Sequence, residues 1–268
     1  MRVSKKVRWF GLFMFYIGVV PFAKFWRFWM LGSREQWFMN GDVYHEYWPD
    51  MHIHVEALRL GDWAIYNPFM NYGFPMVSDP QNGVYYPISW IYLVAGLFLD
   101  HAKAFYVFEW ITLVPVGILG LGMHLYLRRI QCSEQAAFLG AIIAMSSGFV
   151  NRAYYLKFMQ AFVWIPWLML VMEMCLERIS LRRAVLLGAV VGTSVLAGGP
   201  PGVFYLVLWC GVYFAFRSFQ EWRRGRWSHV LRVMCWLPLS VVVASALGAV
   251  VFLPVLDVVG TTVRKGVG

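Results

Sequence analysis

The sequence predicts an all-α protein that lies in a membrane and crosses it several times. Sixty per cent of its 268 residues are hydrophobic and only 14% are charged. Long apolar segments follow one another along the chain, and the acidic and basic residues are segregated between them. A soluble domain would leave such segments facing water, whereas a bilayer accepts them, so the soluble, disordered and disulfide-framework classes are excluded.

Seven apolar segments are candidates for membrane spans, since a bilayer core of about 30 Å needs about 20 helical residues. An eighth stretch, residues 88–99, is shorter and is predicted to be interfacial or re-entrant. The predicted spans are residues 9–31, 104–127, 134–150, 161–176, 184–198, 203–217 and 233–255.

Charge placement predicts the orientation of these spans. With seven crossings, most Lys and Arg residues fall on the side that also holds the N-terminus, and the positive-inside rule makes that side cytoplasmic. A crossing at 88–99 would move Arg128 and Arg129 to the outside and break the pattern. Topology thus explains the net charge of +9, and nucleic acid is not an expected partner.

The segment 32–103 becomes a large external loop within a single transmembrane module, residues 1–268. Pro49 and Gly61 are start and stop signals for a helix over 49–60. Apolar residues lie on one face of this helix and His52, Glu56 and Arg59 on another, which is typical of an interfacial helix. Residues 61–87 are rich in Gly, Pro, Asn and aromatic residues, which predicts an ordered irregular loop.

Asp42 is the principal catalytic candidate, because it follows the first span at the lipid boundary. Partial desolvation there would adapt a carboxylate to act as a general base. The alternative is a solvated interfacial carboxylate or a helix cap. The neighbouring His45 and Glu46 favour the catalytic interpretation.

Metal binding in this loop has two alternatives. His52 and His54 are two positions apart, so on a helix they point in different directions and do not form a zinc pair. Asp42, Glu46 and Asp50 offer oxygen ligands that suit Mg²⁺ or Mn²⁺, which makes a divalent cation the one cofactor that the sequence would accommodate.

Basic residues on the external side depart from the inside bias. Arg152, Lys157 and Arg264 are predicted there, at a depth where they would hold the phosphate of a lipid. Plain attraction to lipid head groups is the alternative. The loop aromatics are explained by an interfacial belt, and some of them would also suit packing against a sugar ring.

Several motifs resemble one bacterial family. They are GD at 41–42, YNPFMNYGFPMVSDPQNGVYYP at 66–87, LRR at 127–129, SSGF at 146–149 and LAGGPPGVFYL at 196–206. Together they look like the YfhO-type membrane proteins of the GT-C glycosyltransferase superfamily. The resemblance implies a seven-helix module with a large first external loop and a location in the bacterial inner membrane. It also implies transfer of a sugar from a polyprenyl-phosphate donor to a cell-envelope acceptor, with Asp42 as the base.

The predicted function is therefore a membrane glycosyltransferase or its N-terminal half. The alternatives are a lipid-carrier transporter, a scaffold subunit in envelope glycan assembly, or an inactive fragment. Expected partners are the polyprenyl-phosphate sugar lipid, membrane lipids and a second chain, because members of that family continue beyond the seventh helix. The candidate substrate and acceptor residues are His45, Glu46, Asp50, Tyr66, Asn67, Asp79, Gln81 and Tyr86.

Overall fold

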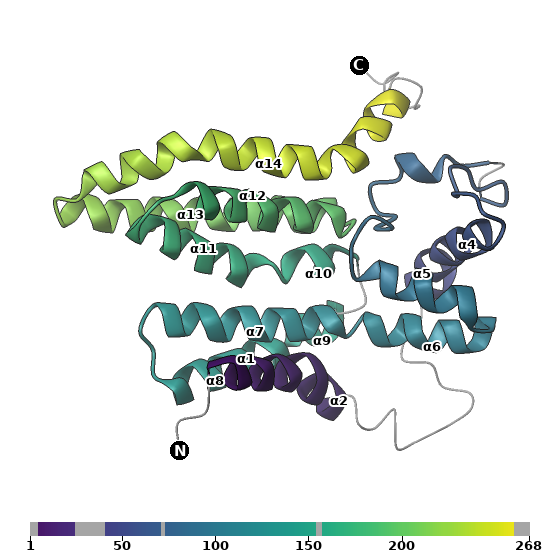
Figure 1. Ribbon diagram of the computed structural model, residues 1–268, viewed down its shortest axis with the longest axis horizontal. Helices are drawn as coiled ribbons and strands as arrows, with labels where there is room; N and C mark the ends of the chain where they lie inside the picture. The colour runs from purple at the N-terminus through teal and green to yellow at the C-terminus, as the bar shows by residue number, and fades with distance from the viewer. Residues whose placement is uncertain (1–4, 25–40, 71–72, 154–156, 260–268) are drawn as a thin grey trace.

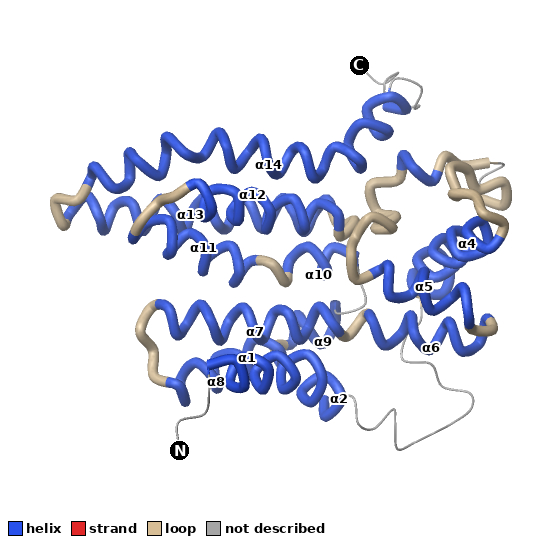
Figure 2. The backbone as a smooth tube through the Cα atoms, in the orientation of Figure 1, coloured by secondary structure: helices blue, strands red, loops and turns tan. Residues whose placement is uncertain are grey.

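The computed structural model describes residues 5–24, 41–70, 73–153 and 157–259. Within those ranges the regular elements are helices, and the only β-type pairing is an isolated bridge between Asn67 and Phe74. Figure 2 shows the helices and the loops that join them. The predicted all-α class is confirmed for the described part of the chain.

The long helices run side by side in a bundle, and the elements of the first loop gather at one end of it (Figure 1). The first-loop group consists of η2 (Val43–Tyr47), α4 (Trp48–Arg59), η3 (Met76–Ser78) and α5 (Ser89–Phe98). The bundle consists of α1 (Lys5–Phe13), η1 (Met14–Val19), α2 (Val20–Lys24), α6 (His101–Ile111), α7 (Val114–Arg129), α8 (Glu134–Ser146), α9 (Gly148–Ala153), α10 (Lys157–Phe162), α11 (Ile165–Glu177), α12 (Leu181–Leu196), α13 (Pro200–Arg223) and α14 (Trp227–Val259).

Within the described ranges, four helical segments are long and apolar enough to cross a membrane: His101–Arg129, Lys157–Glu177, Pro200–Arg223 and Trp227–Val258. They coincide with four of the seven predicted spans. The described parts of the other three predicted spans fall on shorter helices, and residues 25–31 of the span 9–31 lie outside the described residues. Trp9–Val19 and Glu134–Val150 are short apolar helices, and α12 has 16 residues. The count of seven therefore stays a prediction.

Proline positions explain where the long helical segments start and bend. Pro115 and Pro166 lie in the first turns of α7 and α11, where the missing N–H leaves no helical hydrogen bond unmade. Two of the long segments are therefore pairs of helices with a short turn between them. These pairs are α6 with α7 and α10 with α11. Pro200 opens α13 in the same way.

Small residues let the bundle helices approach closely, as is common in membrane proteins. A Cβ at Gly117 of α7 would lie 2.7 Å from the Ile17 Cα of η1, so only glycine fits there. Ser240 of α14 donates a hydrogen bond of 2.9 Å to the carbonyl oxygen of Ala184 in α12. The same two helices meet at Gly192, where a Cβ would lie 2.7 Å from the Leu247 side chain.

The outer helices expose apolar side chains. Phe204, Trp209 and Phe216 of α13 are each more than half exposed, as are Val241 and Leu253 of α14. An exposed surface of this size and composition is unfavourable in water and suits contact with lipid. The exposed faces of α13 and α14 therefore agree with their membrane-spanning length.

Candidate functional site

A polar cavity of about 180 Å³ lies where the first loop meets the bundle. Its walls come from η2, α4, the loop over 61–87 and the first residue of α10. A cavity of this size is small compared with pockets for drug-sized ligands. The lining residues are Glu46, Tyr47, Asp50, Met70, Phe74, Asp79, Gln81, Asn82 and Lys157.

Among the described residues of this lining, Lys157 is the only basic one, and its side chain is only 3% exposed. Its Nζ donates a hydrogen bond of 3.1 Å to the carbonyl oxygen of Asn82 and lies 5.4 Å from the centre of the Tyr47 ring. The carboxylates of Asp50 and Asp79 act on it electrostatically. A buried ammonium is tolerated only when such partners compensate its lost hydration.

The acids of the cavity have raised pKa values. Burial raises the pKa of Asp50 from 3.8 to about 6, and the charge of Asp79 adds to the rise while Lys157 opposes it. Burial also raises the pKa of Asp79, against the hydrogen bond of 2.8 Å that its Oδ1 accepts from the Gln81 N–H. The two carboxyls thus share one ammonium in a partly desolvated site.

Two buried polar side chains beside the cavity lack hydrogen-bond partners among the described residues. They are His54, which is 1% exposed, and Asn82. The two side chains interact without reaching hydrogen-bonding geometry, and burial lowers the pKa of His54 to about 4. His54 is therefore neutral near pH 7. Such unsatisfied groups are uncommon in protein interiors and occur at functional sites.

Glycine contacts position the loop against the bundle. Gly83 and Gly198 both have positive φ, at 66° and 77°. A Cβ at Gly198 would lie 2.9 Å from the Gly83 Cα, and a Cβ at Gly83 would lie 3.0 Å from Lys157 Nζ. The sequence blocks 66–87 and 196–206 are thereby in direct contact, and the contact places Asn82 over Lys157.

Hydrogen bonds from two tryptophans fix the end of the loop. Trp90 Nε1 donates to the carbonyl oxygen of Val84 at 3.0 Å, and Trp164 Nε1 donates to the Tyr86 hydroxyl at 3.2 Å. Tyr86 is buried against Ala161 of α10 and Ala197 at the end of α12, and it does not line the cavity. Earlier in the loop, Asn67 and Phe74 exchange two backbone hydrogen bonds of 2.7 and 2.8 Å. The cavity walls are thus built from ordered loop segments.

The structure brings together only some of the residues that the sequence predicts for the site. Asn67 is buried, and its side chain opposes the rise in the pKa of Asp50. Asp42, His45 and Tyr66 are exposed and do not line the cavity. The side chain of Arg152 and the whole of Arg264 lie outside the described residues. The predicted residues that line the cavity are Glu46, Asp50, Asp79, Gln81 and Lys157.

Lys157 is buried, whereas the sequence predicts it at the external surface. The first loop folds over it and supplies the acids that compensate its charge. Asp42 lies near Tyr47, which lines the cavity. Burial raises the pKa of Tyr47 to about 12, and the charge of Asp42 adds to this rise. Sequence reasoning missed Asn82 and His54. The Asn-Gly pair at 82–83 is a turn signal that would have placed Asn82 at a bend.

A divalent cation at Asp42, Glu46 and Asp50 has no converging geometry, since these three do not form a metal-ligating group among the described residues. The positive charge that Asp50 and Asp79 require comes from Lys157. Binding of Mg²⁺ or Mn²⁺ by these three residues therefore stays a prediction, and no preformed set of ligands is found among the described residues.

An apolar groove of about 620 Å³ lies between α7, α9, α11 and α13. It is lined almost entirely by carbon, including Phe149, Phe162 and Trp209. Phe158, next to Lys157 on α10, contacts Phe149 with 6.0 Å between ring centres. The groove thus extends along the bundle from the helix that carries Lys157.

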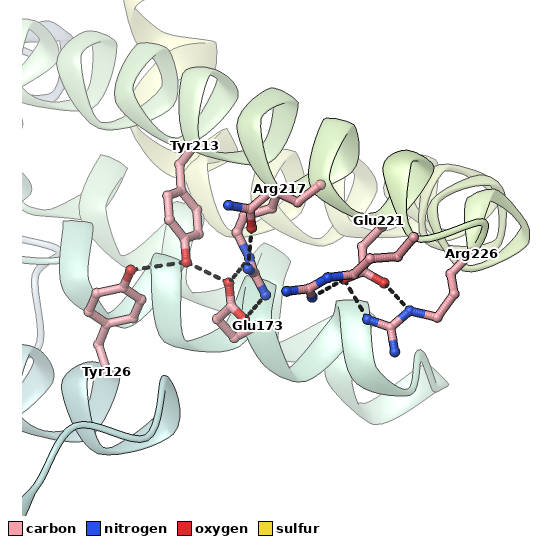
Figure 3. Close-up of polar contacts among 8 residues, drawn as sticks. Tyr126, Glu173, Tyr213, Arg217, Glu221 and Arg226 are labelled. Carbon is pink, nitrogen blue, oxygen red and sulfur yellow. Dashed lines mark hydrogen bonds and ion pairs between the residues drawn. The ribbon is translucent and has the colours of Figure 1, made fainter.

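A second charged cluster lies at the opposite end of the bundle, near the turn between α13 and α14 (Figures 1 and 3). Glu173 accepts hydrogen bonds of 2.5 Å from Tyr213 and 2.7 Å from Arg217, and Tyr126 donates to Tyr213 at 3.0 Å. Glu221 pairs with Arg226 at 2.8 Å. These contacts connect α7, α11 and α13.

Comparison with known protein families, with curated proteins and with solved structures finds no match to this chain.

Proposed function

We propose that this protein is a membrane glycosyltransferase of the GT-C type, which transfers a sugar from a polyprenyl-phosphate donor to a cell-envelope acceptor. The motifs of the first loop suggested this activity. The observation that carries the proposal is that one helix, α10, lines both the polar cavity, with Lys157, and the apolar groove, with Phe162. A donor of this kind has one sugar-bearing polar end and one long apolar chain, and it needs both environments.

The composition of the cavity favours a sugar as its occupant. Three carboxyls and one ammonium line it, so the site offers many acceptors and few donors. Sugar hydroxyls donate hydrogen bonds to such carboxylates, whereas a phosphate would be repelled by them. We therefore propose that the phosphate of the donor contacts Arg152 and Arg264, the basic residues that the sequence analysis suggests for it. Its small volume suits a single sugar ring.

The apolar groove suits the lipid chain of the donor. Its lining is carbon-rich, and it runs along α11 and α13, two of the helices of membrane-spanning length. Burial of a polyprenyl chain there would replace contacts with lipid tails. The groove would orient the chain so that its phosphate end lies near α10.

The reaction needs a base, a leaving group and a path for one proton. The acceptor hydroxyl oxygen attacks the anomeric carbon of the sugar, and the bond from that carbon to the phosphate oxygen breaks. The phosphate leaves with the bonding electron pair and remains on the lipid. The hydroxyl proton passes to Asp42, which is exposed and so accessible to an acceptor from outside. Asp50, Asp79 and Lys157 position the sugar.

A non-catalytic lipid carrier or scaffold is the second candidate, and the apolar groove favours it equally. Carrier binding needs the groove and the phosphate-holding residues but no base. The two functions therefore differ in their dependence on Asp42.

The test uses the full chain in proteoliposomes with a polyprenyl phosphate that carries a radiolabelled hexose. Asp42→Asn is expected to lower the rate of sugar transfer by about 10²-fold or more, which is typical of a lost general base, while binding of polyprenyl phosphate is retained. Asp62→Asn is the matched control, since Asp62 is an exposed aspartate of the same loop outside the cavity. Full transfer by Asp42→Asn would remove Asp42 from the mechanism. Binding without transfer by the unaltered chain would favour the carrier.

A further inference from the structure

A second group of ligating side chains lies on α4, separate from the cavity. His52 and Glu56 are one helical turn apart, and His101 stands at the start of α6. One ligating atom from each of the three lies within 4.8 Å of the others. None of the three lines the polar cavity. His54 points elsewhere, toward Trp63, as the helical spacing predicts.

The spacing of these atoms is close to that of a zinc site. His52 Nε2 lies 3.4 Å from Glu56 Oε1, and two ligands of tetrahedral Zn²⁺ are about 3.3 Å apart when each bond is about 2.0 Å. The ring centres of His52 and His101 are 4.5 Å apart. Because His101 is exposed at a helix end, rotation of its side chain can bring its nitrogen to the remaining ligand position.

The surrounding residues hold the ligands in place. The Tyr92 hydroxyl lies 3.3 Å from His52 Nδ1, which leaves Nε2 directed at Glu56, and Trp48 stacks on the His52 ring at 5.2 Å. Partners of this kind, which bind the second nitrogen of a histidine, are typical of metal sites.

Arg59 orients the carboxylate. Its Nη1 donates to Glu56 Oε1 at 2.8 Å, and its Nη2 donates to the carbonyl oxygens of Gly96 and Leu99 at 2.6 and 2.7 Å. The guanidinium is therefore fixed by the end of α5 and is not a freely moving competitor for a cation. Carboxylates that ligate metals commonly accept a second hydrogen bond in this way.

We propose that His52, Glu56 and His101 bind one Zn²⁺ ion. Two imidazoles and one carboxylate are a ligand set that Zn²⁺ accepts, and a fourth position remains open toward the exposed side of His101. The ion connects α4 to α6 and so stabilises the docking of the helix that carries Asp50. This inference is independent of the glycosyltransferase proposal.

The test measures metal binding by the purified full chain, without a histidine tag, after treatment with a chelator. Titration with ZnCl₂ is expected to load one zinc per chain and to raise the unfolding temperature. Substitution with Co²⁺ is expected to give the visible absorption of a tetrahedral site. His101→Ala and Glu56→Gln should each weaken zinc binding by 10-fold or more.

His229→Ala is the matched control, since this histidine lies on α14 at the other end of the bundle. It is expected to bind zinc as the unaltered chain does. His101 is exposed, so its replacement does not threaten the fold in the way that replacement of the partly buried His52 does. Zinc binding that is absent in the unaltered chain, or equal in His101→Ala, Glu56→Gln and His229→Ala, would overturn the proposal.

Discussion

The two ends of the bundle carry charged clusters that differ in how the charges of their carboxylates are compensated. At the α13–α14 end, Glu173 accepts hydrogen bonds from Tyr213 and Arg217. At the first-loop end, Lys157 faces two acids, and His54 and Asn82 beside it lack hydrogen-bond partners among the described residues. At the α13–α14 end Glu173 and Glu221 each have an arginine partner, although the buried Ser218 hydroxyl there also lacks a hydrogen-bond partner among the described residues. At the first-loop end two carboxyls share one ammonium. We expect the arginine-paired carboxylates to stabilise helix packing and the incompletely compensated ones to be more available to a polar ligand.

The largest expected effect is that of Lys157→Met, which leaves the half-buried Asp50 and Asp79 without a compensating positive charge. Loss of one partner from a buried ion cluster lowers the free energy of unfolding by about 3–5 kcal/mol. Thermal unfolding in detergent at neutral pH measures it. The added substitution Asp79→Asn removes one of the two repelling charges and should recover part of the loss. A double variant no more stable than Lys157→Met would contradict the shared ammonium.

Glu173→Gln tests the opposite end of the bundle. It leaves the Arg217 guanidinium without its carboxylate, which is expected to lower the free energy of unfolding by about 3 kcal/mol. At a temperature where the variant stays folded, binding of polyprenyl phosphate should be unchanged. Loss of binding in a folded Glu173→Gln chain would break the distinction between the two ends.

Gly198→Ala tests the docking of the loop. A non-glycine residue at φ of 77° is destabilised by about 1–2 kcal/mol, and the added Cβ meets the backbone of Gly83. We expect a lower unfolding temperature together with weaker binding of polyprenyl-phosphate sugar. Gly211→Ala is the control, because a Cβ there meets no atom within 4 Å. Equal binding by both variants would show that the docked loop is not needed.

Asp50 makes a contribution of definite sign to the pH dependence of stability. Its pKa is about 6 in the folded chain against 3.8 ordinarily, so the folded chain retains a proton that the unfolded chain releases. The contribution of Asp50 to stability is therefore greatest below about pH 4 and falls as pH rises through about 6, by on the order of 1–2 kcal/mol for this partly exposed group. His54, whose pKa is lowered to about 4, contributes with the opposite sign over the same range. Asp50→Asn should remove the fall that Asp50 causes and so make the slope of unfolding free energy against pH more positive between pH 4 and 7. An unchanged slope in Asp50→Asn would assign the effect to other groups.

The sequence predicted the helical class and the acids of the site, because apolar segments and charge segregation are local properties. It placed Glu46, Asp50 and Asp79 in one loop, and these residues line one cavity. Helix lengths were less predictable: α12 has 16 residues, and α8 ends at Ser146. Whether these two helices cross the membrane depends on the position of the bilayer, which a hydropathy pattern does not give.

Long-range contacts explain what sequence reasoning could not predict. Burial of Lys157 depends on the contact of Gly83 with Gly198, which are more than a hundred positions apart. The predicted span 203–217 ends at Arg217, whereas Arg217 lies within α13 and pairs with Glu173, 44 positions earlier. Neither contact produces a periodic signal, because the partners lie on different elements.

Photo-crosslinking tests the central claim most directly. A polyprenyl-phosphate sugar with a diazirine on its sugar would be bound by the full chain in proteoliposomes, irradiated, and its attachment sites read by mass spectrometry. The account predicts labels within η2, α4 and residues 79–82, with loss of label when unmodified donor is added in excess. Labels around Arg217 and Arg226, at the other end of the bundle, that excess unmodified donor removes would contradict it.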